Sequence, residues 1–189
     1  MERYHELANR LDHGSVWLKS ARVLPQAAID KIRKMSLFKK LESVYGKFDM
    51  ADEENVGREG IYWRLVRPNE PADIGPLHAD AWFWALGHGI TPPGFRRVKV
   101  WVAIYCEPGK SGLRIVPNSH QKRWPYWSEE RHGFMKPCFD EAMVDLPIKL
   151  AMTAPGKAIV FSDLLLHGGA VNTGYRTRVS VEFTMFVRN

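Results

Sequence analysis

Cysteine is scarce in this chain, which contains only Cys106 and Cys138 and has no C-x-x-C motif. Two cysteines do not make a disulfide framework, so we expect a protein of a reducing compartment. No apolar run approaches the length of a membrane span, and the polar N-terminus, MERYHELANRLDHG, lacks the features of a secretory signal. Internal repeats and low-complexity segments are also missing. These absences predict a soluble, cytoplasmic protein with no membrane partner, and 189 residues predict a single domain.

Acidic residues are fewer than basic ones, with 21 Asp and Glu against 27 Lys and Arg and a net charge of +6. An excess of this size is compatible with nucleic acid or with an anionic small molecule as the partner. The basic residues are dispersed, and their densest clusters, in 31–40 and at Arg96-Arg97, form no continuous stripe. The pattern therefore argues against nucleic acid and favours a small-molecule substrate, for which an anionic group would explain the excess charge.

The N-terminal third predicts helix, and the rest of the chain predicts short strands. Apolar residues recur about once per helical turn in residues 25–43, which predicts one helix with an apolar face. After residue 60 the pattern has a period of two, and Gly and Pro separate the segments. We therefore expect a mostly β fold with flanking helices: a double-stranded β-helix of the jelly-roll or cupin type, with the N-terminal helix packed on one sheet. Residues 1–58 would be the helical support and 59–189 the barrel core, with a loop or lid at about 119–145.

Alternation along the predicted strands indicates which side chains face the interior. In residues 176–187, valines, Phe183 and Met185 lie on one side, and polar residues lie on the other. Such an ordered polar face is typical of a barrel with a wet interior. The same alternation turns Tyr62 and Arg64 of one strand, and Lys99 of another, inward. The polar face of the last strand consists of Arg176, Arg178, Ser180, Glu182 and Thr184.

The candidate metal ligands are His78 and Asp80, in GPLHADAWFW, and His167, in FSDLLLHGGAVN. Residues i and i+2 of a strand point to the same face, so His78 and Asp80 are expected to converge from one strand. Two histidines and one carboxylate are the ligand set of a non-haem Fe(II) facial triad, which leaves coordination positions open. His120, in PNSH, competes with His167 for the third position. The basic strand after His167 could balance a dicarboxylate.

Three ordered motifs resemble the phytanoyl-CoA dioxygenase-like family of Fe(II)/2-oxoglutarate oxygenases. SGLRIVPNSHQ is similar to that family's GxLxVxPGSH segment, and APGKAIVFSDLLLHGGAVNTGYRTRVSVEF is similar to its C-terminal segment. LHAD precedes both, so the resemblance covers about residues 60–187. It implies a jelly-roll fold, Fe(II) held by His78, Asp80 and His167, and 2-oxoglutarate and O₂ as co-substrates.

The resemblance also implies residues that bind 2-oxoglutarate. Arg178, with Ser180, resembles the arginine–serine pair that holds the distal carboxylate, whereas an ungapped alignment favours Arg176. A guanidinium suits this role because it donates two parallel hydrogen bonds to a carboxylate. Trp101 matches a tryptophan near the co-substrate, although it is equally consistent with a core residue. The inward-facing residues Tyr62, Arg64 and Lys99 are further candidates for holding 2-oxoglutarate or an anionic substrate.

The activity that the resemblance implies is hydroxylation of a small-molecule metabolite, with release of succinate and CO₂. The intact carboxylate in H-x-D argues against halogenation, and Gly169 replaces a hydroxyl residue found in some members. The alternative is a metal-binding cupin-like module without oxygenase activity, which would not need Arg178 and Ser180. The chain is expected to be a monomer or a homodimer. Six aromatic residues are expected near the mouth of the pocket, namely Trp82, Phe83, Trp84, Trp124, Tyr126 and Trp127.

Overall fold

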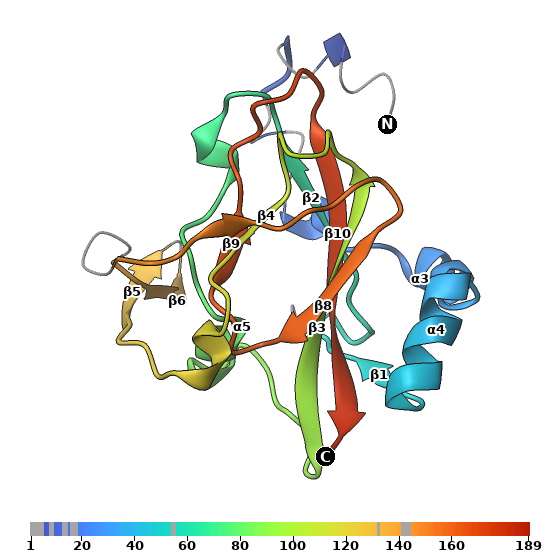
Figure 1. Cartoon of the computed structure of the whole chain (residues 1–189). Helices are drawn as coiled ribbons and strands as arrows, with labels where there is room; N and C mark the ends of the chain where they lie inside the picture. The colour runs from blue at the N-terminus through green and yellow to red at the C-terminus, as the bar shows by residue number, and fades with distance from the viewer. Residues whose placement is uncertain are drawn as a thin grey trace.

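A five-stranded antiparallel sheet forms the larger layer of the molecule (Figure 1). The computed structural model describes residues 6–7, 10–12, 15, 19–53, 56–131, 133–140 and 145–189. The long strand β10 pairs on one side with β3, which in turn pairs with β8. On its other side β10 pairs with β2 near its start and with β1 near its end. The bounds are β1 Asp49–Met50, β2 Tyr62–Val66, β3 Phe95–Tyr105, β8 Ala158–Ser162 and β10 Arg178–Arg188.

A smaller three-stranded sheet lies opposite, in the order β7 (Lys149–Leu150), β4 (Leu113–Ile115) and β9 (His167–Gly169). The strands that the structure describes form separate sheets and are not joined into one closed barrel. The predicted mostly β class with flanking helices is therefore confirmed, whereas barrel closure stays a prediction. None of the helices in the described segments is long and apolar enough to cross a bilayer.

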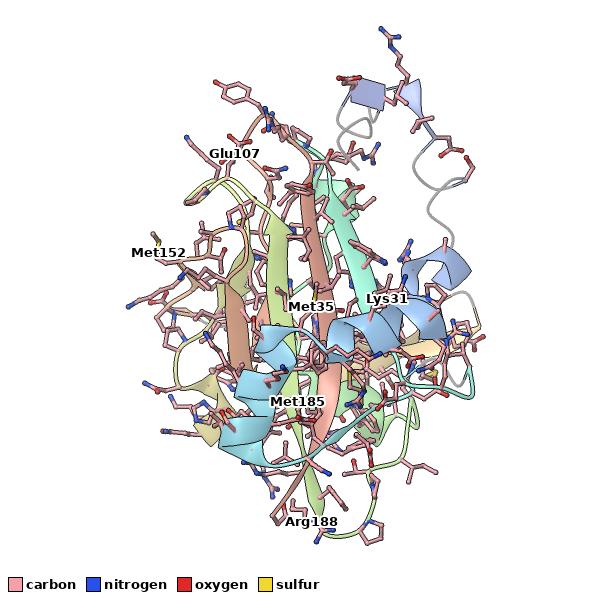
Figure 2. The ribbon with its side chains drawn as sticks, turned by 90° about the vertical axis from the view of Figure 1, so that its right-hand side faces the viewer. Lys31, Met35, Glu107, Met152, Met185 and Arg188 are labelled. Atoms are coloured by element: carbon pink, nitrogen blue, oxygen red, sulfur yellow. The ribbon has the colours of Figure 1, made fainter. Side chains whose placement is uncertain are left out.

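Two helices pack on the outer face of the large sheet, as the apolar periodicity predicted. Figure 2 looks onto this layer, in which α3 (Gln26–Arg33) and α4 (Ser36–Tyr45) lie across the strands. The prediction of a single helix over 25–43 was wrong, because the backbone is extended at Met35. Ile29 and Phe38 would be about two and a half turns apart in a continuous helix and so on opposite sides. The break lets both side chains enter the same core.

The alternation predicted for the two central strands is confirmed. Val98, Val100 and Val102 of β3 and the odd-numbered residues 181–187 of β10 belong to the core beneath the helices. Lys99 and Trp101 face the opposite side, toward the small sheet, where Trp101 contacts Leu113. The exception is Arg176, because β10 begins only at Arg178 and Arg176 is exposed in the preceding loop.

The segment 119–145 contains more regular structure than the loop that was predicted. It holds the short helix η4 (Ser119–Gln121) and an antiparallel hairpin of β5 (Trp127–Arg131) and β6 (Phe134–Cys138). Residues 132 and 141–144 of this segment lie outside the described residues. The described part of the chain also contains the helices η2 (Lys19–Arg22), η3 (Pro71–Asp73) and α5 (Asp80–Ala85).

Candidate metal centre and its cavity

His78, Asp80 and His167 come together between the two sheets, although not in the way predicted. His78 forms an isolated antiparallel bridge with His167, with backbone N···O distances of 2.9 Å in both directions. Asp80 is the first residue of α5 and not a strand residue. Ala79 is extended, so the chain leaves the bridge and turns directly into the helix. The convergence of His78 and Asp80 therefore comes from a bridge followed by a helix start.

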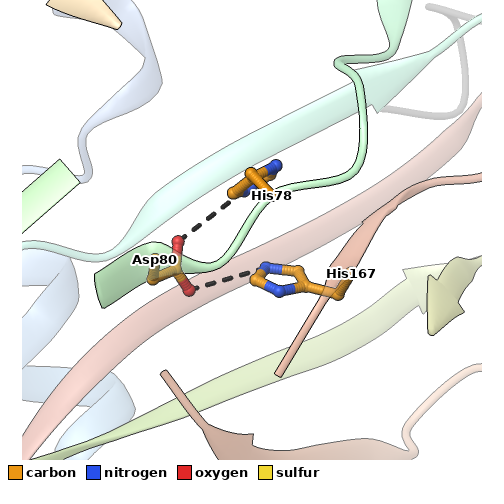
Figure 3. Close-up of side chains that lie close together, drawn as sticks. All are labelled: His78, Asp80 and His167. Carbon is orange, nitrogen blue, oxygen red and sulfur yellow. Dashed lines mark ion pairs between the residues drawn. The ribbon is translucent and has the colours of Figure 1, made fainter. Parts of the chain in front are cut away.

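The three side chains present their ligand atoms to one point (Figure 3). One ligand atom from each residue lies within 4.8 Å of the others. The Asp80 carboxylate lies 3.7 Å from Nε2 of His78 and 3.5 Å from Nε2 of His167. Its Oδ2 atom is buried and has no hydrogen-bond partner. This arrangement of two nitrogens and a carboxylate oxygen could hold a divalent metal ion.

Hydrogen bonds to the backbone fix both imidazole rings. Nδ1 of His78 lies 3.0 Å from the carbonyl oxygen of Pro76, and Nδ1 of His167 lies 2.9 Å from that of Leu165. A carbonyl only accepts, so each Nδ1 carries the proton and each Nε2 keeps a lone pair for a metal. Burial, together with the neighbouring His167, lowers the pKa of His78 to about 4. The His78 ring is therefore neutral near pH 7, as a metal ligand must be.

A buried lysine lies against the Asp80 carboxylate. Lys99 is 2% exposed, and its Nζ atom lies 3.7 Å from Oδ2 of Asp80 and 3.4 Å from Oε1 of Glu53. Burial acts to raise the pKa of Asp80, but the Lys99 ammonium and the two imidazoles outweigh it and hold that pKa below its usual value. Asp80 is therefore ionised and available as a ligand.

The metal centre opens into a cavity of about 710 Å³. Tyr62, Arg64, Lys99 and Trp101, which were predicted to face inward, line it. Of the six aromatic residues predicted at its mouth, only Phe83 and Trp84 do so. Trp82 instead stacks on Tyr126 at a centroid distance of 4.7 Å, in a separate core that also includes Trp124, and Trp127 is half exposed on the hairpin. The hairpin contributes Phe134 and Lys136 to the lining.

Arg178 also lines this cavity, and it is buried and without a carboxylate partner among the described residues. Its Nη1 donates a 2.6 Å hydrogen bond to the carbonyl oxygen of Gly112, and its guanidinium carbon lies 5.8 Å from the ring centroid of Trp101. Its Nε is buried without a hydrogen-bond partner, and so is Oγ of Ser180, the next residue on the same face of β10. Burial lowers the pKa of Arg178 to about 10, so the group stays charged near pH 7.

The other residues considered from sequence lie away from this position. Arg176 is exposed, and its backbone N–H donates to Glu107. His120 is exposed on η4 and does not take part in the triad. Gly169 lines the cavity, and a Cβ atom there would lie 3.1 Å from Cγ2 of Ile74. Ile74 therefore occupies the space that a hydroxyl side chain at 169 would need.

Three cavity-lining carboxylates were not predicted as site residues: Asp73, which pairs with Arg67, and Glu53 and Glu182. Glu182 was identified as part of the polar face of β10, and alternation along that strand turns it toward the cavity, but it was not proposed as a site residue. Glu53 lies in ADEENVGREG, which carries no periodicity. It reaches the cavity because β1 pairs with the end of β10 and the N–H of Ala51 donates to the carbonyl of Thr184. No local sequence signal marks such a long-range placement.

Comparison with known proteins identifies a family over most of the chain. The model of the family described as Phytanoyl-CoA dioxygenase (PhyH) matches residues 7–180. A search of the curated proteins finds no significant match.

Solved structures share the fold at low sequence identity. EvdO2 from Micromonospora carbonacea var. aurantiaca is 18% identical, with a TM-score of 0.59 over 88% of this chain and 66% of that chain. The same protein complexed with 2-oxoglutarate is 17% identical, with a TM-score of 0.57 over 87% of this chain and 65% of that chain. AviO1 from Streptomyces viridochromogenes Tue57 is 14% identical, with a TM-score of 0.51 over 83% of this chain and 59% of that chain. This chain therefore spans less than two thirds of the length of each of them.

Proposed function

The chain belongs to the phytanoyl-CoA dioxygenase family, and on that premise we propose that it is an Fe(II)- and 2-oxoglutarate-dependent oxygenase. We further propose that it hydroxylates a small molecule and releases succinate and CO₂. Its residues would provide the iron ligands, the anchor for the co-substrate and the walls of the substrate site.

The donor set of the candidate centre fits Fe(II). Two neutral imidazoles and one carboxylate suit a divalent first-row metal, and they occupy three positions of an octahedral ion. The two backbone hydrogen bonds at Nδ1 leave both Nε2 atoms available, and the orphaned Oδ2 of Asp80 is a buried acceptor that a cation would satisfy. Neither cysteine belongs to the cluster, which argues against a thiolate zinc site.

The buried, unpaired guanidinium of Arg178 is the observation that carries the proposal. An isolated buried charge is unfavourable unless a counter-charge binds to it. The unused Nε of Arg178 and the orphaned Oγ of Ser180 offer two further donors on the same face of β10. A carboxylate bound here would satisfy both groups, and a dicarboxylate would reach from Arg178 toward the metal. A cupin module that only binds metal has no use for these groups.

Bound iron and 2-oxoglutarate would supply the oxidising chemistry, in which O₂ is consumed, 2-oxoglutarate becomes succinate and CO₂, and one oxygen atom enters a C–H bond of the substrate. The protein's part is positional. Arg178, with Ser180, fixes one end of the co-substrate, and the planar ring of Trp101 limits the movement of the guanidinium. The ring of Phe83 packs edge-on against the His78 ring, with a distance of 5.4 Å between the ring centroids, and so limits the movement of that imidazole.

The test is anaerobic reconstitution with Fe(II), followed by titration with 2-oxoglutarate. We expect the visible absorption band of the Fe(II)–2-oxoglutarate chelate, and succinate release once O₂ is admitted. His120→Ala, an exposed histidine, is the matched control for His78→Ala, which should lose both signals. A protein that binds Fe(II) but shows neither band nor succinate would instead be the metal-binding module.

A further inference from the structure

The lining of the cavity includes two ion pairs besides the metal centre and Arg178. Same-face residues of a strand are about 6.8 Å apart, so Glu182 lies about 13 Å along β10 from Arg178. Asp80 reaches the metal centre beside Lys99, which pairs with Thr184 one step further along. The region that contains these ion pairs follows Arg178 along the sheet, since Arg64 pairs with Ser180 and Lys99 pairs with Thr184. We call the region the charged subsite; its lining residues are Glu53, Arg64, Lys99 and Glu182.

The first ion pair of the charged subsite joins Lys99 and Glu53. Oε1 of Glu53 accepts from both the Lys99 ammonium, at 3.4 Å, and the Thr184 hydroxyl. Both donors use the same oxygen, so Oε2 of Glu53 is engaged by no described residue. The Glu53 side chain is 23% exposed, and the residue lines the cavity. Its second oxygen is therefore an acceptor available to a ligand.

The second ion pair repeats this arrangement across β2 and β10. Nε and Nη2 of Arg64 lie 2.8 Å and 2.6 Å from Oε1 of Glu182. In the described part of the chain, no residue donates a hydrogen bond to Oε2 of Glu182. The Arg64 side chain is 43% exposed, so its remaining N–H groups are open to a ligand as well. Each pair is thus internally neutral but keeps one free acceptor.

This combination selects against charged groups. An anion would meet two carboxylates, and a cation would meet an ammonium and a guanidinium that already balance them. A hydroxyl both donates and accepts, so it can bond to a free carboxylate oxygen and to an N–H group without carrying charge. The rings of Phe83 and Phe134 line the same cavity and offer apolar faces.

We propose that the charged subsite binds a neutral, hydroxyl-rich substrate of the sugar or cyclitol class, with Glu53 and Glu182 accepting from its hydroxyl groups. This inference rests on the proposed oxygenase function. It differs from the anionic substrate that the excess of basic residues suggested, because both cations of the subsite are paired with carboxylates.

The experiment uses the Fe(II)- and 2-oxoglutarate-loaded protein and a panel of neutral sugars and cyclitols that includes myo-inositol and methyl α-D-glucopyranoside. D-Glucuronate and D-glucosamine are the matched anionic and cationic probes. Perturbation of the chelate band measures binding, and succinate release above the substrate-free rate measures turnover. We expect neutral members to respond at lower concentration than either charged probe.

Glu182→Gln should weaken the neutral response roughly 10- to 100-fold, the range for losing one hydrogen bond to a charged group. The same change leaves Arg64 without its counter-charge, so Arg64 can bind the carboxylate of D-glucuronate. The preference for neutral probes over D-glucuronate should therefore decrease. A purely structural role would reduce both responses equally. Glu129→Gln, which removes an exposed partner of Arg131 on the hairpin, is the control and should change neither.

The proposal is overturned if either charged probe responds at lower concentration than the neutral compounds. It is also overturned if the chelate band forms but no neutral compound of the panel gives a response. Equal losses for neutral and anionic probes in Glu182→Gln also overturn it. Absence of the chelate band itself is a different outcome, which refutes the oxygenase function.

Discussion

Replacing Arg178 by methionine should separate co-substrate binding from folding stability. Burial lowers the pKa of this guanidinium to about 10, a change that corresponds to about 3 kcal/mol against the charged form. Methionine removes that cost, but it also removes the hydrogen bond to the Gly112 carbonyl, worth about 1.5–3 kcal/mol. The two effects nearly cancel. We therefore expect the free energy of unfolding without ligand to change by no more than about 1–2 kcal/mol.

The effect on 2-oxoglutarate should be much larger. Removing one partner of a buried, hydrogen-bonded charge pair costs about 2–5 kcal/mol, or about 30- to 4000-fold in affinity. Calorimetric titration of 2-oxoglutarate into the Mn(II)-loaded protein measures this directly. Urea unfolding gives a second measurement, because a ligand at 100 times its Kd stabilises the folded state by about 2.7 kcal/mol. Arg178→Met should lose at least about two thirds of that increment at the same ligand concentration.

Arg176→Met is the matched control, since this exposed arginine is the other candidate that the sequence offers. It should leave both the affinity and the stability unchanged. The reasoning is refuted if Arg176→Met weakens 2-oxoglutarate and Arg178→Met does not. It is also refuted if Arg178→Met destabilises the ligand-free protein by more than about 3 kcal/mol, because Arg178 would then be a structural residue.

Three of the remaining predictions concern the charged groups, and one concerns packing. Asp80→Ala should weaken Co(II) binding by at least about 100-fold, measured by spectroscopic titration, because an octahedral ion loses its only anionic protein ligand. Lys99→Met should destabilise the metal-free protein by about 3–5 kcal/mol in urea with EDTA, since it leaves buried carboxylates without their partner. Burial acts to raise the pKa of Glu182, but the positive charges around it, Arg64 foremost, lower that pKa to about 2. The ionised carboxylate therefore stabilises the folded state above the unfolded pKa, and this contribution is lost as the pH falls toward 2. In Glu182→Gln, the free energy of unfolding should depend less on pH between about 4.5 and 2. Gly169→Ser should lower the melting temperature, and Ile74→Ala should restore it in the double variant, because the new Cβ would lie 3.1 Å from Ile74; additive losses would contradict this.

The parts of the site that the sequence predicted are those set by local geometry. Lys99 and Trp101 on β3, and Arg178 and Ser180 on β10, were placed correctly because side chains of a strand alternate whatever its partners are. The three candidate ligands were singled out from their motifs, and the structure brings their side chains together. Asp80 was assigned to the wrong element, yet the prediction of convergence was right, since an extended Ala79 followed by a helix start also turns both side chains inward.

The parts that failed depend on contacts between distant segments. The break at Met35 follows from the need of Ile29 and Phe38 to reach one sheet, which the one-helix interpretation overlooked. Trp82 and Tyr126 were expected at the cavity mouth, but they stack on each other in a separate core that also contains Phe139 and Leu166. Glu53 has no signal in its own segment, because its position is set by the pairing of β1 with β10.

Strand β10 connects these observations into one physical account. Its polar face carries Arg178 and Ser180 at one end and Glu182 and Thr184 at the other. Successive residues on one face of a strand are about 6.8 Å apart, so the strand fixes the spacing of these four side chains. β3 holds this strand along most of its length. A register slip of one residue would turn the whole polar face into the core beneath the helices. The apolar residues on the opposite face of β10 therefore secure the positions of the co-substrate anchor and of the charged subsite along the strand. The chemistry of the site thus depends on the packing of α3 and α4, neither of which is in contact with the metal centre.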